Sequence, residues 1–197
     1  MPVVNVSSVS RAVALLKNGE VVVFPTETAY ALGGCAVLSS TIDAIYDLKK
    51  REGDKPLALV ASDIHQVEQF FYLSATQREF AQHYWPGPLT LLLRPRSRAF
   101  GKKMNKNGIT LGVRVTGHPI ARKLCQLVES PLVSTSANIS GAGTPYSASA
   151  IARNFSKAKQ NIYFINAGTL PRRATSAIVE LSDDSISVLR WNPILRK

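Results

Sequence analysis

The chain of 197 residues carries 24 lysines and arginines against 13 acids, a formal net charge of +11, and 45% of its residues are hydrophobic. This length and apolar content predict one soluble globular domain over residues 1–197 and exclude a disordered chain. No apolar run reaches the roughly 18 residues of a membrane-spanning helix, and the N-terminus shows no secretory leader. Two cysteines with three histidines form neither a disulfide framework nor a zinc motif. We therefore expect a cytoplasmic protein with reduced, buried thiols at Cys35 and Cys125.

The hydrophobic pattern predicts helices and strands that alternate irregularly. In chain order, we expect a helix at 7–17, a strand at 21–24, a helix at 40–49, a strand at 56–60, helices at 63–71 and 75–84, strands at 89–93 and 109–115, a helix at 118–128, a strand at 131–133, a helix at 148–155, and strands at 162–165, 177–181 and 186–189. The basic stretch at 94–107 is expected to be a loop. The fold class is therefore α/β, with a twisted sheet of mixed parallel and antiparallel strands flanked by helices.

Two of the helices carry a capping signal at their start. Ser74 directly precedes the helix at 75–84 and is a favourable N-cap residue. Ser40, with Asp43 three residues later, resembles a capping box and predicts the start of the second helix there.

The positive charge is concentrated in one part of the chain. Residues 80–179 contain fourteen lysines and arginines but a single acid, Glu129. Signs are normally interspersed on a globular surface, because like charges repel one another. The imbalance favours a basic face for nucleic acid or phosphates, although a basic surface that serves only solubility is the alternative. Charge alone does not separate RNA binding from nucleotide binding.

Common catalytic motifs are missing from the sequence. We find no phosphate loop of the G-x-x-x-x-G-K-[ST] type, no G-x-G-x-x-G fingerprint, no G-x-S-x-G elbow and no H-E-x-x-H. The basic hundred residues also contain no pair of acids for acid–base catalysis or a metal site. Anion chemistry would therefore depend on cations, hydroxyls and backbone N–H groups, which suits phosphoryl or nucleotidyl transfer.

Three tracts carry such groups, and each has a plain structural alternative. The tract at 25–30 follows a buried strand, where an α/β sheet usually binds its ligand, but an ordinary polar turn would look the same. The basic tract at 49–51, with Lys55, can clamp a polyphosphate or merely complement a helix dipole. The tract at 134–144 is rich in Ser, Gly and Thr and can form an anion-binding nest or a solvated linker.

Read together, these tracts belong to a series of five ordered motifs. The motifs are Phe24-Pro25-Thr26-Glu27-Thr28-Ala29-Tyr30-Ala31-Leu32-Gly33; Lys49-x-Arg51 with Lys55-Pro56-Leu57; Trp85-Pro86-Gly87-Pro88-Leu89-Thr90; Val113-Arg114 before His118-Pro119; and Ser136-x-Asn138 with Ser140-Gly141. The series covers essentially the whole chain and resembles the YrdC/TsaC family of threonylcarbamoyl-AMP synthases, in its short single-domain form.

The resemblance implies a YrdC-like fold with a basic concave cavity. It also implies an enzyme that condenses L-threonine, bicarbonate or CO2, and ATP into threonylcarbamoyl-AMP and pyrophosphate. A threonylcarbamoyl-transferase complex would then pass the group to adenosine 37 of tRNA. ATP would be a substrate, with Mg2+ held mainly by its phosphates and by water. The basic face would contact tRNA or double-stranded RNA, and no membrane partner is implied.

The resemblance assigns roles to individual residues, carried over by motif. The catalytic tetrad would be Lys49, Arg51, Ser136 and Asn138. The residues that contact ATP would be Arg51, Lys55, Thr110, Ser136, Thr144 and Arg190. The residues that hold threonine would be Thr28, Arg114, Ser134 and Ser176. No residue is expected to bind a metal directly.

Three places depart from the family pattern. Val60 stands about where relatives carry a histidine on the second strand, Ala31 stands where glycine is common, and the stretch at 172–177 replaces their Gly-x-Glu-Ser-Thr around Ser176. Arg172 and Arg173 in that stretch can bind the triphosphate or RNA instead.

A second function fits the same charge. A double-stranded RNA or tRNA-binding module, or a ribosome-assembly module without catalysis, would also be strongly basic. Such a module needs cations spread over a face and has no use for a pocket that combines Lys-x-Arg with Ser-x-Asn. Pyrophosphate release that depends on both L-threonine and bicarbonate separates the two functions.

Overall fold

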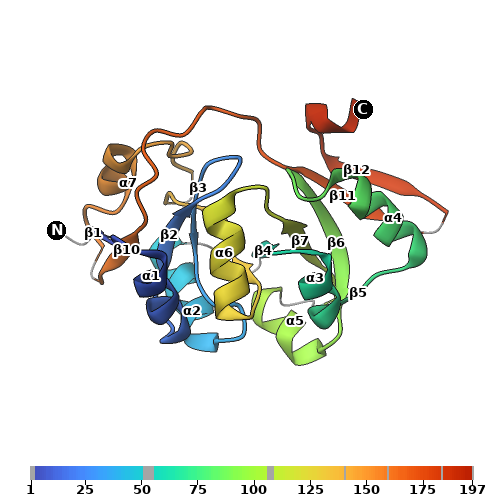
Figure 1. Ribbon diagram of the computed structural model, residues 1–197, viewed down its shortest axis with the longest axis horizontal. Helices are drawn as coiled ribbons and strands as arrows, with labels where there is room; N and C mark the ends of the chain where they lie inside the picture. Colours follow the sequence, from blue (N-terminus) through green and yellow to red (C-terminus); the bar gives the residue numbers. More distant parts are fainter. Residues whose placement is uncertain are drawn as a thin grey trace.

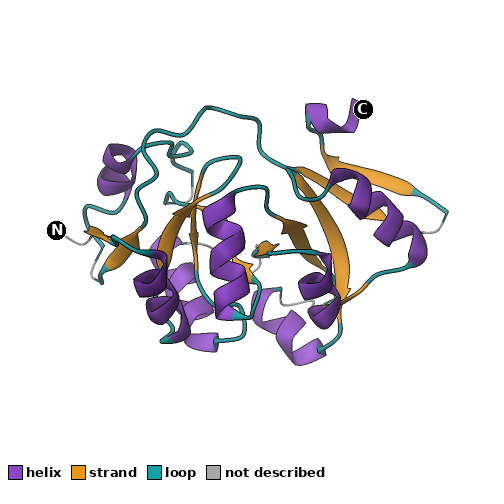
Figure 2. Ribbon diagram, in the orientation of Figure 1, coloured by secondary structure: helices purple, strands orange, loops and turns teal. Residues whose placement is uncertain are grey.

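The chain forms two twisted sheets that lie side by side with helices packed on them (Figures 1 and 2). A computed structural model describes residues 3–50, 56–105, 109–139, 141–158, 160–182 and 184–196. Among these residues, the helices are α1 (Val9–Lys17), α2 (Ser39–Lys49), α3 (Ile64–Phe70), α4 (Ala75–Tyr84), α5 (Arg98–Met104), α6 (Pro119–Val128), α7 (Ala148–Asn154) and the 3-10 helix η1 (Pro193–Arg196). The strands are β1 (Val3–Asn5), β2 (Val22–Pro25), β3 (Tyr30–Gly33), β4 (Leu59–Ala61), β5 (Phe71–Tyr72), β6 (Leu89–Pro95), β7 (Leu111–Val115), β8 (Leu132–Val133), β9 (Thr135–Ser136), β10 (Ile162–Phe164), β11 (Ala177–Leu181) and β12 (Ile186–Arg190).

Both sheets mix parallel and antiparallel pairs. The first has the order β1-β10-β2-β3-β9, and the second has the order β12-β11-β6-β7-β4-β8, with β5 paired to β6. In the first sheet β10 runs parallel to β2 while β3 runs antiparallel to it. In the second, β4 is parallel to β7 but β6 is antiparallel to it. The predicted fold class is confirmed, with the strands divided between two sheets rather than joined in one.

A short stretch of chain connects the two sheets at their closest approach. Strand β8 pairs with β4 in the second sheet, and two residues later β9 pairs with β3 in the first. The N–H of Val133 also donates to the Gly34 carbonyl at 2.9 Å. A side chain at Gly33 would overlap the carbonyl oxygen of Val133, so glycine is needed for this approach. Ser134, between β8 and β9, is therefore held where the sheets meet.

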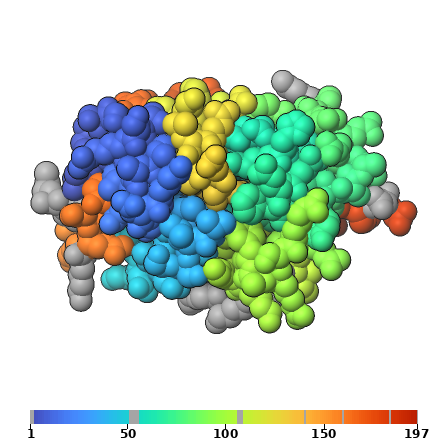
Figure 3. All heavy atoms as spheres, turned by 60° about the horizontal axis from the view of Figure 1, so that its bottom comes forward, coloured from blue at the N-terminus to red at the C-terminus, as the bar shows by residue number. Residues whose placement is uncertain are grey.

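The apolar run that leads into β2 is continuous because residues on both of its faces are buried. Val21 and Val23 belong to one buried cluster, whereas Val22 and Phe24 belong to a second cluster that includes residues of α1 and α6. Both faces of this strand are covered, which removes the need for alternating polar residues. The segments that form α1, α2, α3, α5 and α6 lie side by side on the face drawn in Figure 3. Opposite that face, residues 165–176 cross from one sheet to the other along the top of Figure 1.

Most predicted elements occur, and the Ser74 cap is confirmed as a complete capping box. The loop expected at 94–107 is wrong in part, because α5 forms within it. Ser97 caps α5, and Phe100 and Met104 bury one side of it. Ser40 is not an N-cap either: α2 starts one residue earlier, with Leu38 at its cap position and no side-chain cap bond.

Strands β1, β3, β5 and β9 are additions to the predicted pattern. All four are short; β1 and β9 pair with strands distant in the chain, β3 forms a hairpin with β2, and β5 pairs with β6. Cys35 and Cys125 are free and buried, as predicted. Burial raises the pKa of the Cys125 thiol to about 12. Within the described part of the chain, the helices are all too short or too polar to cross a bilayer.

Candidate active site

A cavity of about 330 Å3 is lined by residues from both sheets and from the loops between them. Its described lining contains three guanidinium groups and ten hydroxyl-bearing side chains, with no carboxylate among them. The lining residues are Thr26, Thr28, Ala29, Tyr30, Ala31, Pro56, Ala58, Arg114, Ser134, Thr135, Ser136, Thr144, Tyr146, Arg173, Thr175, Ser176, Ile178 and Arg190. This composition suits a ligand with negative charge and several hydrogen-bonding groups.

The turn between β2 and β3 forms one wall of the cavity. The Thr26 hydroxyl donates to the Ala29 carbonyl at 2.7 Å and accepts from the Ala29 and Thr28 N–H groups at 3.2 and 3.3 Å. Threonine stabilises such a turn because its hydroxyl replaces backbone partners. Buried Thr26 therefore shapes the turn that places Thr28 against the cavity.

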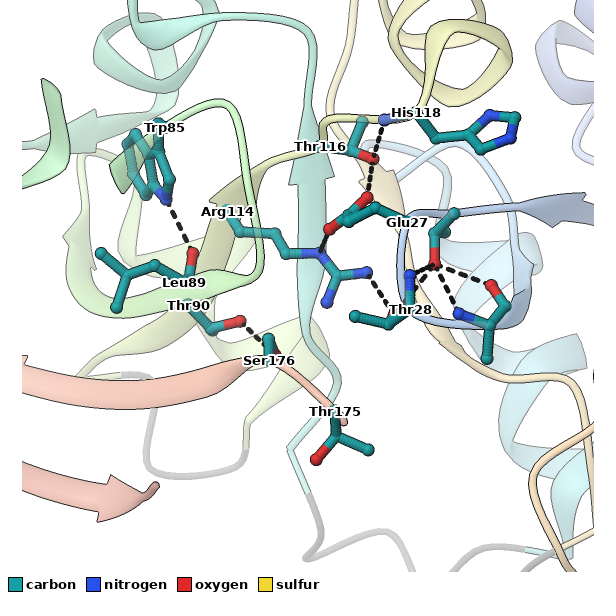
Figure 4. A network of polar contacts seen from close by, with 12 residues as sticks. Glu27, Thr28, Trp85, Leu89, Thr90, Arg114, Thr116, His118, Thr175 and Ser176 are labelled. Carbon is teal, nitrogen blue, oxygen red and sulfur yellow. Dashed lines mark hydrogen bonds and ion pairs between the residues drawn. The ribbon is translucent and has the colours of Figure 1, made fainter. Parts of the chain in front are cut away.

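Arg114, near the end of β7, lies beside this turn (Figure 4). Its Nη2 atom donates to the Thr28 hydroxyl at 3.4 Å. Its Nε atom is 3.1 Å from Oε1 of Glu27, in an ion pair without the alignment of a hydrogen bond. The other Glu27 oxygen, Oε2, accepts from the Thr116 hydroxyl at 2.5 Å. Both charged side chains of this pair are only 10% exposed, so solvent screens their attraction weakly.

A second guanidinium enters the cavity from β12. Arg190 donates through Nε to the Ser176 carbonyl at 2.7 Å and through Nη2 to the Ser176 hydroxyl at 2.9 Å. That hydroxyl is also 2.9 Å from the hydroxyl of Thr90 on β6. Partial desolvation lowers the pKa of Arg190, and the positive charge of Arg114 lowers it further. An anion bound between these two arginines would relieve their repulsion.

The predicted Lys49–Ser136–Asn138 group is assembled in space. Lys49 Nζ donates to the Ser136 carbonyl at 2.6 Å, the Asn138 carbonyl at 2.7 Å and Asn138 Oδ1 at 3.2 Å. The Ser136 hydroxyl donates to the same Oδ1 at 2.6 Å, and Asn138 Nδ2 donates to the Ala142 carbonyl. Lys49 is 2% exposed. These bonds fold the loop after β9 around the lysine, and Ser136 brings that loop to the cavity.

The structure brings many, but not all, of the predicted site residues together. The cavity is lined by Thr28, Arg114, Ser134 and Ser176 of the threonine set, and by Ser136, Thr144 and Arg190 of the ATP set. Lys49 and Asn138 contact Ser136 but are not among the residues that line the cavity. Thr110 lines a different hollow, with Tyr72 and Arg94, at the opposite end of β7 from Arg114. Arg51 and Lys55 lie outside the described residues.

Several residues of the site had no role in the sequence-based set. Tyr146, Arg173 and Thr175 line the cavity. Of these three, only Arg173 was named from the sequence, as a ligand for the triphosphate or for RNA. Glu27 contacts Arg114 but lines an adjoining hollow rather than this cavity. The signal for Glu27 was weak: an acid between two threonines, directly after a buried strand.

Two α/β sheets around a cavity of arginines and hydroxyls define a class of domain suited to small anionic substrates. Residues 14–191 match the model of the Sua5/YciO/YrdC family, described as "Telomere recombination", and the chain belongs to this family. The resemblance stated from the five motifs is thereby confirmed.

Curated relatives agree with this assignment. The chain is 34% identical to the threonylcarbamoyl-AMP synthase of Pyrococcus abyssi, over 93% of this chain and 52% of that protein. It is 31% identical to the threonylcarbamoyl-AMP synthase of Bacillus subtilis, over 98% of this chain and 56% of that protein. The chain thus spans about half the length of these two relatives.

Solved structures show the same fold. The structure of P. abyssi Sua5 complexed with L-threonine superposes with a TM-score of 0.85 at 31% identity, covering 96% of this chain and 57% of that one. Escherichia coli YciO, at 21% identity, shares the fold with a TM-score of 0.81, covering 95% of this chain and 93% of that one.

Proposed function

We propose that this chain is a threonylcarbamoyl-AMP synthase, which joins L-threonine, bicarbonate or CO2, and ATP into threonylcarbamoyl-AMP and releases pyrophosphate. Two curated relatives that match nearly the whole chain carry this name. A similar solved structure is a complex with L-threonine. These similarities support the proposal that this chain catalyses the same reaction.

The observation that carries the proposal is the single cavity in which two predicted sets of residues meet. Arg114 and Arg190 come from different strands, and Ser134 and Ser136 come from the segment that joins the sheets. Residues assigned to the amino acid and residues assigned to the nucleotide therefore line one hollow. Holding two reactants in contact removes much of the entropic barrier to their reaction.

In this proposal Arg114 binds the threonine carboxylate. A guanidinium presents parallel N–H donors that fit both oxygens of a carboxylate. The hydroxyls of Thr28, Ser134 and Ser176 line the same cavity. These hydroxyls can accept hydrogen bonds from the threonine amine. They can also donate to the threonine hydroxyl or accept from it.

The chemistry follows from the charges of the reactants. The threonine amine attacks the carbon of CO2 and releases a proton to solvent, which gives an N-carboxylate; from bicarbonate that proton leaves together with a hydroxide as water. A carboxylate oxygen then attacks the α-phosphorus of ATP, and the bond to the bridging oxygen of pyrophosphate breaks. Because two anions must approach, Arg190 and the other cations stabilise the transition state by offsetting their repulsion.

We propose that Mg2+ enters with ATP and is held mainly by phosphates and water. Among the described residues, no group of three or more His, Cys, Asp or Glu side chains is positioned to hold a metal ion. When bound, the ion would neutralise phosphate charge during transfer.

The partners of this reaction are proposed on the same basis. The product would pass to a threonylcarbamoyl-transferase complex that modifies adenosine 37 of tRNA, in the cytoplasm. The net charge of +11 supports direct contact with tRNA or double-stranded RNA as well.

Mass spectrometry of the purified chain incubated with L-threonine, bicarbonate and ATP tests the proposal. The expected result is threonylcarbamoyl-AMP, with pyrophosphate release that needs both threonine and bicarbonate. Tight, salt-sensitive tRNA binding without any such product would instead favour an RNA-binding module without catalysis.

A further inference from the structure

We propose that Glu27 is a positioning residue, which fixes the Arg114 guanidinium so that its terminal nitrogens face the carboxylate of the amino-acid substrate. This inference rests on the proposed function for the identity of that substrate. Glu27 is not among the described residues that line the cavity; it lines an adjoining hollow that shares Thr28 and Arg173 with the cavity.

The two parts of the Arg114 guanidinium have different partners. The carboxylate approaches Nε, at 3.1 Å, whereas Nη2 lies against the Thr28 hydroxyl at 3.4 Å. In Figure 4 the guanidinium faces Glu27 and Thr28, and Ser176 lies below it beside Thr90. Holding the planar group at Nε fixes its orientation, because the rest of the guanidinium cannot rotate independently of Nε. The terminal nitrogens therefore remain directed to the cavity.

Glu27 is itself held by an element adjacent to Arg114 in sequence. The Thr116 hydroxyl, fully buried, donates to Oε2 at 2.5 Å and accepts from the His118 N–H at 3.3 Å. His118 is the N-cap of α6. The carboxylate is thus tied to a helix start on one side and to Arg114 on the other, which leaves it little freedom to move.

Charge gives this arrangement a second consequence. A guanidinium that is only 10% exposed is costly to bury without a counter-ion. Because Glu27 supplies that charge from outside the cavity, the cavity itself stays free of carboxylates and open to an anionic substrate. A carboxylate on the cavity side would neutralise Arg114 equally well but would repel the substrate.

The test compares four substitutions in the full chain. Glu27→Gln removes the charge with little change in shape, and Thr116→Val removes the hydroxyl that holds Glu27. Thr116→Ser keeps that hydroxyl and serves as the conservative rescue. Glu79→Gln alters an exposed carboxylate on α4 and serves as the matched control.

Kinetics supply the first readout. We expect the KM for L-threonine to rise about tenfold in Glu27→Gln and several-fold in Thr116→Val, with the KM for ATP and kcat changed less than about threefold. Thr116→Ser and Glu79→Gln should match the unaltered chain. Equal losses for both substrates, or a normal threonine KM in Glu27→Gln, would overturn the proposal.

NMR supplies a readout that does not depend on the reaction. The Arg114 Nε–H signal, assigned by its loss in Arg114→Lys, should shift or broaden in Glu27→Gln and stay unchanged in Glu79→Gln. An unchanged signal in folded Glu27→Gln shows that Glu27 does not hold the side chain. If the unaltered chain neither binds threonine nor forms product, the proposed function fails while the NMR result still decides whether Arg114 is fixed by Glu27.

Discussion

Lys49 and Arg114 are both buried cations beside the same cavity, yet their surroundings differ. Lys49 donates to three oxygens of the Ser136–Asn138 segment, so its charge is directed into the loop after β9. Arg114 meets the Glu27 carboxylate through Nε and reaches the cavity with its terminal nitrogens. A compact ammonium suits the first task, since it can satisfy oxygens in several directions. A planar fork suits the second, since one edge can be anchored while another binds substrate.

A basic residue in a motif can therefore serve the site in two ways. Lys49 shapes the segment that presents Ser136, and Arg114 is in a position to contact the ligand directly. Substitution should therefore separate the two residues, with a loss of stability for Lys49 and a loss of substrate affinity for Arg114.

The largest expected effect comes from Lys49→Met. This change leaves buried carbonyl and amide oxygens without their ammonium donor, which should lower the free energy of unfolding by about 3 kcal/mol. Urea denaturation measures the loss. Lys17→Met, at the last residue of α1 and exposed, is the matched control and should change stability by less than about 0.5 kcal/mol. A stable but inactive Lys49→Met protein would show instead that the lysine acts on the substrate.

Arg114→Lys should have the next largest effect. Lysine keeps the charge but cannot hold Glu27 and a carboxylate at the same time in fixed geometry. We expect the KM for L-threonine to rise at least about tenfold, or about 1.4 kcal/mol, while the KM for ATP changes much less. Arg98→Lys on α5 is exposed and should leave both constants unchanged. Equal increases for both substrates would contradict the assignment of Arg114 to threonine.

Ser176→Ala tests the other guanidinium. The change removes the hydroxyl that accepts from Arg190 and pairs with Thr90, but it keeps the backbone bond to Arg190. The loss of one hydrogen bond of about 1 kcal/mol should weaken substrate binding about fivefold. Isothermal titration calorimetry with a non-hydrolysable ATP analogue and with threonine measures the dissociation constant of each. Ser10→Ala on the exposed side of α1 is the control, and normal binding by Ser176→Ala would show that Arg190 needs only the carbonyl.

The smallest expected effect is a pH dependence at His118. Burial lowers the pKa of His118, and the charge of Glu27 opposes this shift only in part. The unfolded chain then binds more protons than the folded one at this residue as the pH falls below about 6.5, its ordinary pKa. Its contribution to stability is therefore complete above that pH and declines on acidification.

Urea denaturation between pH 7.5 and 5 measures this decline. His118→Asn keeps an N-cap acceptor for the Ile120 N–H but cannot titrate. The stability of this variant should fall less steeply with acidification than that of the unaltered chain. Parallel curves for the two proteins would assign the decline to other groups.

Local signals in the sequence were sufficient for most elements and for much of the cavity. Ser74 specified the start of α4, and the β-branched run before Pro25 specified β2. Thr28 and Arg114 were assigned by motif, and both line the cavity although 86 positions separate them in the chain. Such elements and residue types depend on interactions between near neighbours or on shared motifs, which a linear pattern preserves.

The direction of Lys49 could have been predicted from its spacing. Ile42, Ile45 and Lys49 fall at helical positions i, i+3 and i+7, and all three are buried on α2. The motif pointed to a catalytic lysine, whereas the periodicity already placed this residue on the inward face. The structure shows the inward position that the periodicity indicates, and the catalytic role stays a prediction.

The pairing of Glu27 with Arg114 had no counterpart in the linear pattern. It depends on the β2–β3 turn of the first sheet lying next to β7 of the second, which in turn requires the close approach at Gly33. The displacement of Thr110 from the cavity has a different, local origin, since the rise of an extended strand places it at the opposite end of β7 from Arg114. Composition and motifs defined which chemical groups the chain could use. Which cation met which oxygen was set by the contact between the sheets, because distances of about 3 Å between distant segments arise from packing of the whole fold.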